Sequence, residues 1–154
     1  MSETLITFLA SFLLWFMFGG LLVLWIIDGR VKKEIVLHII ISVILVFFLC
    51  YLIKLFVPSV RPFYFNGRPS LSLTTHANNA FPSTHTAVAF ALATTLYLHD
   101  KKLGKAYLII AFLVGIGRIL ANVHYRVDVL AGASLGLLVS LAVDRFHFFG
   151  LLKK

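Results

Sequence analysis

The chain has 154 residues, of which 60% are hydrophobic and only 13% are charged, and its mean hydropathy is +0.98. A soluble domain of this length cannot cover so much apolar surface, so the composition favours a lipid bilayer as the natural solvent. The formal net charge of +8 would suit nucleic acid only if a soluble face carried it. In a membrane protein, Lys and Arg report topology and contacts with anionic headgroups, so no nucleic-acid partner is expected.

Five apolar segments follow one another along the chain. The first is free of charge and long enough to span roughly 30 Å of hydrocarbon. We expect membrane spans at about 5–27, 35–53, 82–98, 106–123 and 129–143. The sequence therefore predicts an all-α integral membrane protein, a bundle of about five transmembrane helices that forms a single domain over residues 1–154.

The longest polar segment is the loop at about 58–80, and an excess of basic residues on one side orients it. With five spans the termini lie on opposite sides, and nine Lys and Arg then fall on one side against five on the side of this loop. The positive-inside rule makes the first side cytoplasmic. We expect a multi-pass protein of a bacterial inner membrane whose long loop faces the periplasm or the outside.

Charged side chains intrude on the ends of the spans that meet this outer side. Arg118 lies inside the fourth span, Asp128 begins the fifth and Lys54 ends the second. A charge at mid-helix costs about 2.5–3.5 kcal/mol on insertion scales, so such charges are usually paired and functional. Two plainer readings stay open: Lys54 as a snorkelling residue, and Arg118 with Asp128 as a structural ion pair.

The third span begins with the stretch "FPSTHT", residues 81–86. A helix start explains most of this stretch, because Pro is favoured in the first turn and Ser or Thr can cap the N-terminus. It does not explain His85. His124 and Asp128 are four residues apart, so in a helix the carboxylate can hold the imidazole Nδ1–H and leave Nε2 as a nucleophile. His85 can then protonate a leaving oxygen.

Three cations on the same side, Lys54, Arg61 and Arg118, would suit the non-bridging oxygens of a phosphoryl group. Ser83 and the first backbone N–H groups of the third span add neutral donors. The pattern predicts a phosphate site at the outer, membrane-surface ends of the last three or four helices.

These residues form three motifs in register. Lys54 and Arg61-Pro62 fit K-x6-R-P, residues 82–85 resemble P-S-G-H, and Arg118, His124 and Asp128 fit R-x5-H-x3-D. Together they resemble the signature of the type 2 phosphatidic acid phosphatase superfamily, which also includes vanadium haloperoxidases and bacterial acid phosphatases. The resemblance covers residues from about 54 to 144.

The resemblance implies a phosphohydrolase that uses no metal or other cofactor and forms a phosphohistidine intermediate. His124 would be the nucleophile, Asp128 would orient it, and His85 would be the general acid. The residues expected to bind the substrate phosphate are Lys54, Arg61, Ser83, Thr84 and Arg118.

Two positions depart from the family pattern. Thr84 replaces the usual Gly, which adds a side chain where a backbone N–H would approach phosphate. Gly117 replaces the Ser that commonly precedes the Arg of the third motif, so support from that hydroxyl is absent.

The placement at the membrane surface predicts a lipid whose phosphate is exposed on the outer leaflet. Undecaprenyl pyrophosphate is the first choice, with phosphatidylglycerol phosphate and the 1-phosphate of lipid A as alternatives. Arg68 would contact a second phosphate or lie solvated in the loop. Hydrolysis and phosphoryl transfer to another acceptor both fit a phosphohistidine, and an oligomer is possible. A non-enzymatic alternative is an anion or phosphate channel, which would need an oligomer and no oriented nucleophile.

The remaining histidines and the single cysteine are not assigned to chemistry. His38 and Cys50 lie in apolar runs and are expected to pack in the core. His99 and His147 are expected on the cytoplasmic side and His76 in the outer loop. A metal site from His76, His85 and His124 lacks supporting ligand spacing.

Overall fold

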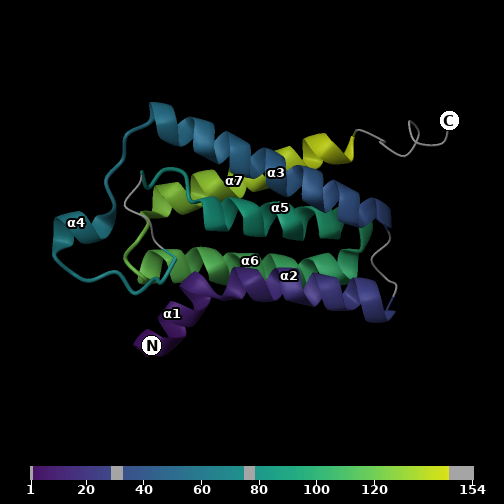
Figure 1. Cartoon of the computed structure of the whole chain (residues 1–154), viewed down its shortest axis with the longest axis horizontal. Helices are drawn as coiled ribbons and strands as arrows, with labels where there is room; N and C mark the ends of the chain where they lie inside the picture. Colours follow the sequence, from purple (N-terminus) through teal and green to yellow (C-terminus); the bar gives the residue numbers. More distant parts are fainter. Residues whose placement is uncertain (1, 29–32, 75–78, 146–154) are drawn as a thin grey trace.

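A computed structural model of the chain describes residues 2–28, 33–74 and 79–145, and these ranges contain helices and no strands. Figure 1 shows the longer helices lying side by side along one long axis. In chain order they are α1 (Glu3–Ser11), α2 (Leu13–Val23), the π-helical turn η1 (Leu24–Asp28), α3 (Lys33–Phe56), α4 (Pro62–Asn66), α5 (Thr84–His99), α6 (Lys101–Leu120) and α7 (Arg126–Asp144). His76 and His147 lie outside the described residues.

The apolar helices agree with a multi-pass membrane protein, with one correction to the expected spans. Helices α3, α6 and α7 are each long and apolar enough to cross a membrane. The expected first span at 5–27 is wrong as one continuous helix, because the chain breaks at Phe12 and α1 and α2 meet at a bend of 54°. If that pair forms one span, the described chain holds up to four candidates. Helix α5 has 16 residues, about 24 Å of rise, so five crossings stay a prediction.

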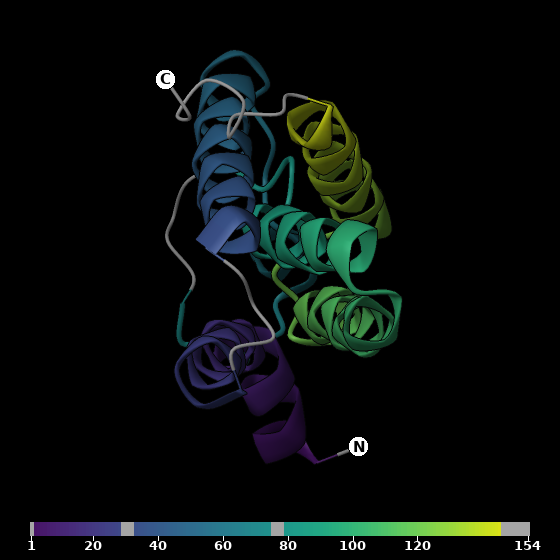
Figure 2. The same cartoon turned by 90° about the vertical axis from the view of Figure 1, so that its right-hand side faces the viewer.

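Helix α5 forms the centre of the bundle. Viewed end-on in Figure 2, it lies between α3, α6 and α7. Its alanines at 87, 89, 91 and 93 are fully buried. Small residues on α7 let the two backbones approach, because a Cβ added at Gly132 would lie 2.5 Å from the Ser83 carbonyl oxygen. Side-chain volume at this position would push the start of α7 away from the start of α5.

Backbone hydrogen bonds join the helix ends that face α4. The N–H of Ser83, just before α5, donates to the carbonyl of Asp128 in the first turn of α7 at 3.0 Å. The N–H of Leu71 in the long loop donates to the carbonyl of Ala121, which follows α6, at 3.1 Å. This end of the bundle therefore joins two stretches that are far apart in the sequence, 71–83 and 121–128.

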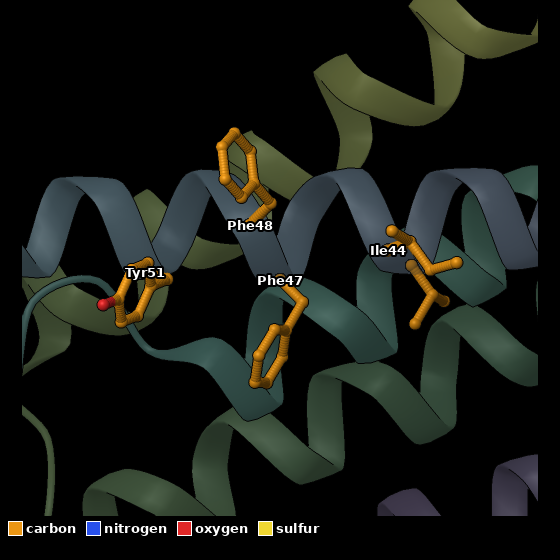
Figure 3. Close-up of a pocket in the computed structure, with 5 residues that line it drawn as sticks. Ile44, Phe47, Phe48 and Tyr51 are labelled. Carbon is orange, nitrogen blue, oxygen red and sulfur yellow. The ribbon is translucent and has the colours of Figure 1, made fainter.

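Large apolar side chains cover the outside of α3. Phe47 and Phe48 are 61% and 52% exposed, and Figure 3 shows them pointing to opposite sides of the helix. With Val43, Ile44 and Tyr51 they line a shallow pocket of about 420 Å³. An apolar surface of this kind suits contact with lipid chains rather than water.

Candidate active site

A cavity of about 520 Å³ opens at the end of the bundle where α4 lies. It contains most of the predicted site and also several residues that the sequence analysis did not identify. Its lining consists of Trp15, Phe47, Tyr51, Lys54, Arg61, Leu73, Thr74, Asn79, Thr84, His85, Arg118 and His124. Six of the eight predicted residues are on this lining, while Ser83 and Asp128 are buried outside it.

The predicted pair of His124 and Asp128 is formed, although not within a helix. Helix α7 begins at Arg126, so His124 lies in the preceding turn. Its Nδ1 lies 3.5 Å from Asp128 Oδ2, and both side chains are 3% exposed. The same oxygen accepts the backbone N–H of Tyr125 at 2.8 Å. The carboxylate therefore caps α7 and is held in place against the imidazole.

The contacts of Arg61 indicate which nitrogen of His124 carries the proton. Arg61 Nη1 donates to the Val123 carbonyl at 2.9 Å and lies 3.4 Å from His124 Nε2. A guanidinium has donors only, so Nε2 must present its lone pair and the proton belongs on Nδ1, toward Asp128. The nitrogen that lines the cavity is thus the unprotonated one.

Burial and nearby cations keep His124 neutral. Desolvation lowers the pKa of His124 from 6.5 to about 4, and the charges of Arg118 and Arg61 act in the same direction while Asp128 opposes them. A neutral imidazole over the whole physiological range is the state that a nucleophile needs.

Arg118, in the last turn of α6, is 1% exposed and is held by neutral oxygens rather than by a carboxylate. Its Nη1 donates to the Ala10 carbonyl at 2.8 Å, to Ser72 Oγ at 2.9 Å and to Thr74 Oγ1 at 3.1 Å. The guanidinium therefore joins α1, the long loop and α6. The structural ion pair with Asp128 that the sequence left open is not how this arginine is satisfied.

Gly117 explains how α1 can supply that carbonyl. A Cβ at Gly117 would lie 2.7 Å from Leu9 Cβ and 2.9 Å from the Ala10 nitrogen. The missing side chain lets the backbone of α1 approach α6 closely enough for Ala10 to accept from Arg118. The family pattern has a serine at the position of Gly117. In this chain the carbonyl of Ala10 accepts a hydrogen bond from Arg118 instead.

The ammonium of Lys54 is held by backbone carbonyls. Its Nζ donates to the carbonyls of Asn79 and Pro82, both at 2.8 Å, and lies 3.4 Å from that of Ala80. The Asn79 amide in turn donates to the Lys54 carbonyl. These contacts, rather than solvent alone, hold the ammonium, and the segment 79–82 fixes it at the cavity.

His85 lies in the first turn of α5, and its Nε2 is 3.1 Å from Thr74 Oγ1. Thr74 thus contacts both His85 and Arg118, a role that only the folded loop reveals. Ser83 is the N-cap of α5, but its hydroxyl contacts Thr86 at 3.0 Å instead of capping the helix. The expectation that the Ser83 hydroxyl caps the helix is therefore wrong, while its place among the phosphate-binding residues stays a prediction.

The charges around the cavity suit a phosphate. Three cationic side chains, Lys54, Arg61 and Arg118, face one carboxylate, Asp128, which leaves two positive charges. A phosphate dianion would balance them, and multiple N–H donors are the geometry that such an anion prefers. The lining also includes the apolar side chains of Trp15, Phe47 and Leu73.

Comparison with known proteins shows which family the chain resembles. The profile of the PAP2 superfamily, the short name of the type 2 phosphatidic acid phosphatase superfamily, matches residues 35–150. This range includes all eight predicted site residues.

Individual relatives agree. Over 143 residues the chain is 32% identical to the "Bacitracin transport permease protein BcrC" of Bacillus licheniformis, covering 93% of this chain and 70% of that protein. It is 30% identical over 132 residues to the "Undecaprenyl-diphosphatase BcrC" of Bacillus subtilis, covering 82% and 65%. A crystal structure of the first transmembrane PAP2 type phosphatidylglycerolphosphate phosphatase from Bacillus subtilis superposes with a TM-score of 0.66 at 28% identity, covering 99% of this chain and 76% of the other.

The close approach at Gly117 makes a testable difference. We expect Gly117→Ser to lower the free energy of unfolding by about 1–3 kcal/mol, because the added side chain meets the backbone of α1. Thermal unfolding in detergent measures this loss. Gly19→Ser is the matched control, since nothing lies within 4 Å of a Cβ there. Equal unfolding midpoints for the two variants would contradict the packing argument.

Proposed function

The chain belongs to the PAP2 superfamily, and from this premise we propose that it is a membrane lipid phosphatase that converts undecaprenyl pyrophosphate to undecaprenyl phosphate. The observation that carries the proposal is the orientation of His124, with Nδ1 at Asp128 and Nε2 at the cavity beside Arg61. A phosphorus atom in this cavity would meet an unprotonated nitrogen surrounded by cations.

In the proposed reaction, His124 Nε2 attacks the terminal phosphorus and the P–O bond to the leaving group breaks. His85 gives its proton to the leaving oxygen, and Asp128 stabilises the charge that develops on the imidazole. Water then attacks the phosphohistidine and releases inorganic phosphate, with His85 taking the proton back. Lys54, Arg61 and Arg118 stabilise the charge on the phosphoryl oxygens, and Thr84 lies on the same lining.

The apolar residues on the cavity lining support a lipid substrate. Phe47 and Tyr51 line both the cavity and the shallow pocket on α3, so the polar site continues into an apolar surface. A phosphate attached to a long hydrocarbon chain can occupy the two together. The similarity to an undecaprenyl-diphosphatase of Bacillus subtilis favours undecaprenyl pyrophosphate among such lipids.

Phosphatidylglycerol phosphate is the second candidate, favoured by the structural similarity to the phosphatidylglycerolphosphate phosphatase. Arg68 is exposed and is not on the cavity lining, so we assign it no contact with the substrate's second phosphate. One relative is named a transport permease, which makes transport the non-enzymatic alternative. A transport pathway has no use for a nucleophile oriented by a carboxylate.

Phosphate release by the purified protein tests the proposal. With EDTA present, undecaprenyl pyrophosphate should release phosphate faster than phosphatidylglycerol phosphate, phosphatidic acid or lipid A. His124→Ala should lower kcat by roughly 10³-fold or more, because it removes the nucleophile. Lys102→Gln, an exposed residue at the opposite end of the bundle, is the control and should keep full activity. Release that persists in His124→Ala would overturn the mechanism, and release from no lipid would favour transport.

The depressed pKa of His124 predicts the acid side of the pH profile. The lowered pKa keeps the imidazole neutral until the pH falls to about 4. As the pH is lowered, protonation of His124 should therefore cause no fall in kcat/KM near pH 6.5. The substrate's own ionisation, followed by phosphorus NMR, is the control. An acid limb near 6.5 that the substrate does not explain would contradict a buried, neutral His124.

Asp128→Asn should reduce kcat by roughly 10²–10⁴-fold, since the carboxylate no longer stabilises the imidazolium.

We further propose that the cavity faces the periplasm or the outside of a bacterial inner membrane, as the charge bias predicts. Arg68 and Lys102 are exposed and come from the two ends of the bundle, and the native Cys50 is buried. In intact cells or spheroplasts, an impermeant thiol reagent should label Arg68→Cys and not Lys102→Cys. Labelling of the Lys102 site alone would invert the orientation.

A further inference from the structure

A second cluster of polar side chains lies at the end of the bundle opposite the cavity. It consists of His38 near the start of α3, His99 at the end of α5 and Asp144 at the end of α7. His38 Nδ1 is 3.2 Å from His99 Nε2, and His99 Nε2 is 3.8 Å from Asp144 Oδ1. One ligand atom from each residue falls within 4.8 Å of the other two. In Figure 1 this is the right-hand end, where α5 and α7 finish.

The cluster continues a layer of hydroxyl groups one helical turn further in. Thr95 Oγ1 donates to Ser42 Oγ at 3.4 Å and to Ser140 Oγ at 3.2 Å, and Ser140 Oγ donates to the Ala91 carbonyl at 2.8 Å. Each hydroxyl residue is four positions from a member of the cluster on the same helix. The same faces of α3, α5 and α7 therefore converge in two successive layers, so helix packing fixes the position of the outer layer.

His99 is oriented in the way that metal-binding histidines are. Its Nδ1 lies 2.9 Å from the Thr95 carbonyl, an acceptor, so Nδ1 carries the proton and Nε2 presents its lone pair to the cluster. A backbone carbonyl on the second nitrogen is the usual outer contact of a histidine ligand, because it fixes both the tautomer and the ring.

We propose that His38 Nδ1, His99 Nε2 and a carboxylate oxygen of Asp144 bind a zinc ion. In a tetrahedral site with bonds of about 2.0–2.1 Å, ligand atoms lie about 3.3 Å apart. The separations of 3.2 and 3.8 Å lie on either side of that value, so side-chain rotations rather than helix movements would close the site. His38 binds with its proton moved to Nε2, and water fills the fourth position.

The ion links three helices and takes no part in the chemistry of the cavity. His38 is 3% exposed, whereas the side chains of His99 and Asp144 are 19% and 36% exposed. The site is therefore closed on the bundle side and open to solvent on the other, which gives the ion a route in. An ion held by α3, α5 and α7 would stabilise the helices that also carry Lys54, His85 and Asp128.

Zinc binding to the full-length protein tests this site. The tag is removed, the protein in detergent is stripped of metal, and zinc content is measured after equilibration and desalting, with Co²⁺ absorption as a second readout. We expect about one ion per chain and an unfolding midpoint that rises with zinc concentration. His99→Gln and Asp144→Asn should both lose the ion and the rise.

Two controls separate this site from other ligands. His124→Ala removes a cavity histidine, and Glu34→Gln removes another carboxylate from the first turn of α3, so both should keep the ion. Phosphate release reports that each metal-site variant is folded, since neither His99 nor Asp144 contacts the cavity. Absence of stoichiometric binding at micromolar free zinc, or binding retained in both His99→Gln and Asp144→Asn, would show that the cluster is only hydrogen-bonded.

Discussion

The burial of cations at one end of an apolar bundle is the constraint on which the cavity depends. Arg118 is 1% exposed, and an unsatisfied guanidinium in that position would be strongly destabilising. Ala10, Ser72 and Thr74 supply the oxygens, so α1 and the long loop must fold onto α6. The contacts of Arg118 Nη1 thereby bring α1 and the long loop to the cavity, and the carbonyls of the segment before α5 hold Lys54 there.

Small residues make these contacts possible. Gly117 allows α1 to reach Arg118, and Gly132 allows α7 to lie against the start of α5. The second approach also brings the Ser83 N–H to the carbonyl of Asp128, which fixes His85 and Asp128 relative to each other through the backbone. In a membrane, close packing and interhelical hydrogen bonds replace the hydrophobic effect between helices, so glycines at these positions position the site as well as stabilise it.

The two ends of the bundle are polar in different ways. The cavity end collects three cations beside two histidines, and Phe47 and Tyr51 join its lining to the apolar pocket on α3. The opposite end collects two histidines and one carboxylate above a layer of hydroxyl groups. A cationic site attracts anions and a mixed histidine and carboxylate site attracts cations, so one small bundle presents opposite binding chemistry at its two ends.

The sequence by itself determined the solvent, the helical class, the family and six of the twelve residues that line the cavity, because charges inside apolar runs and three motifs in register are local signals. The pairing of His124 with Asp128 was also predicted, although from a helical geometry that the turn before α7 replaces. Only the tertiary structure decided the break at Phe12, the inward Ser83 hydroxyl, the contacts of Thr74 and the meeting of His38, His99 and Asp144. Each of these depends on contacts between distant segments, for which spacing along the chain carries no signal.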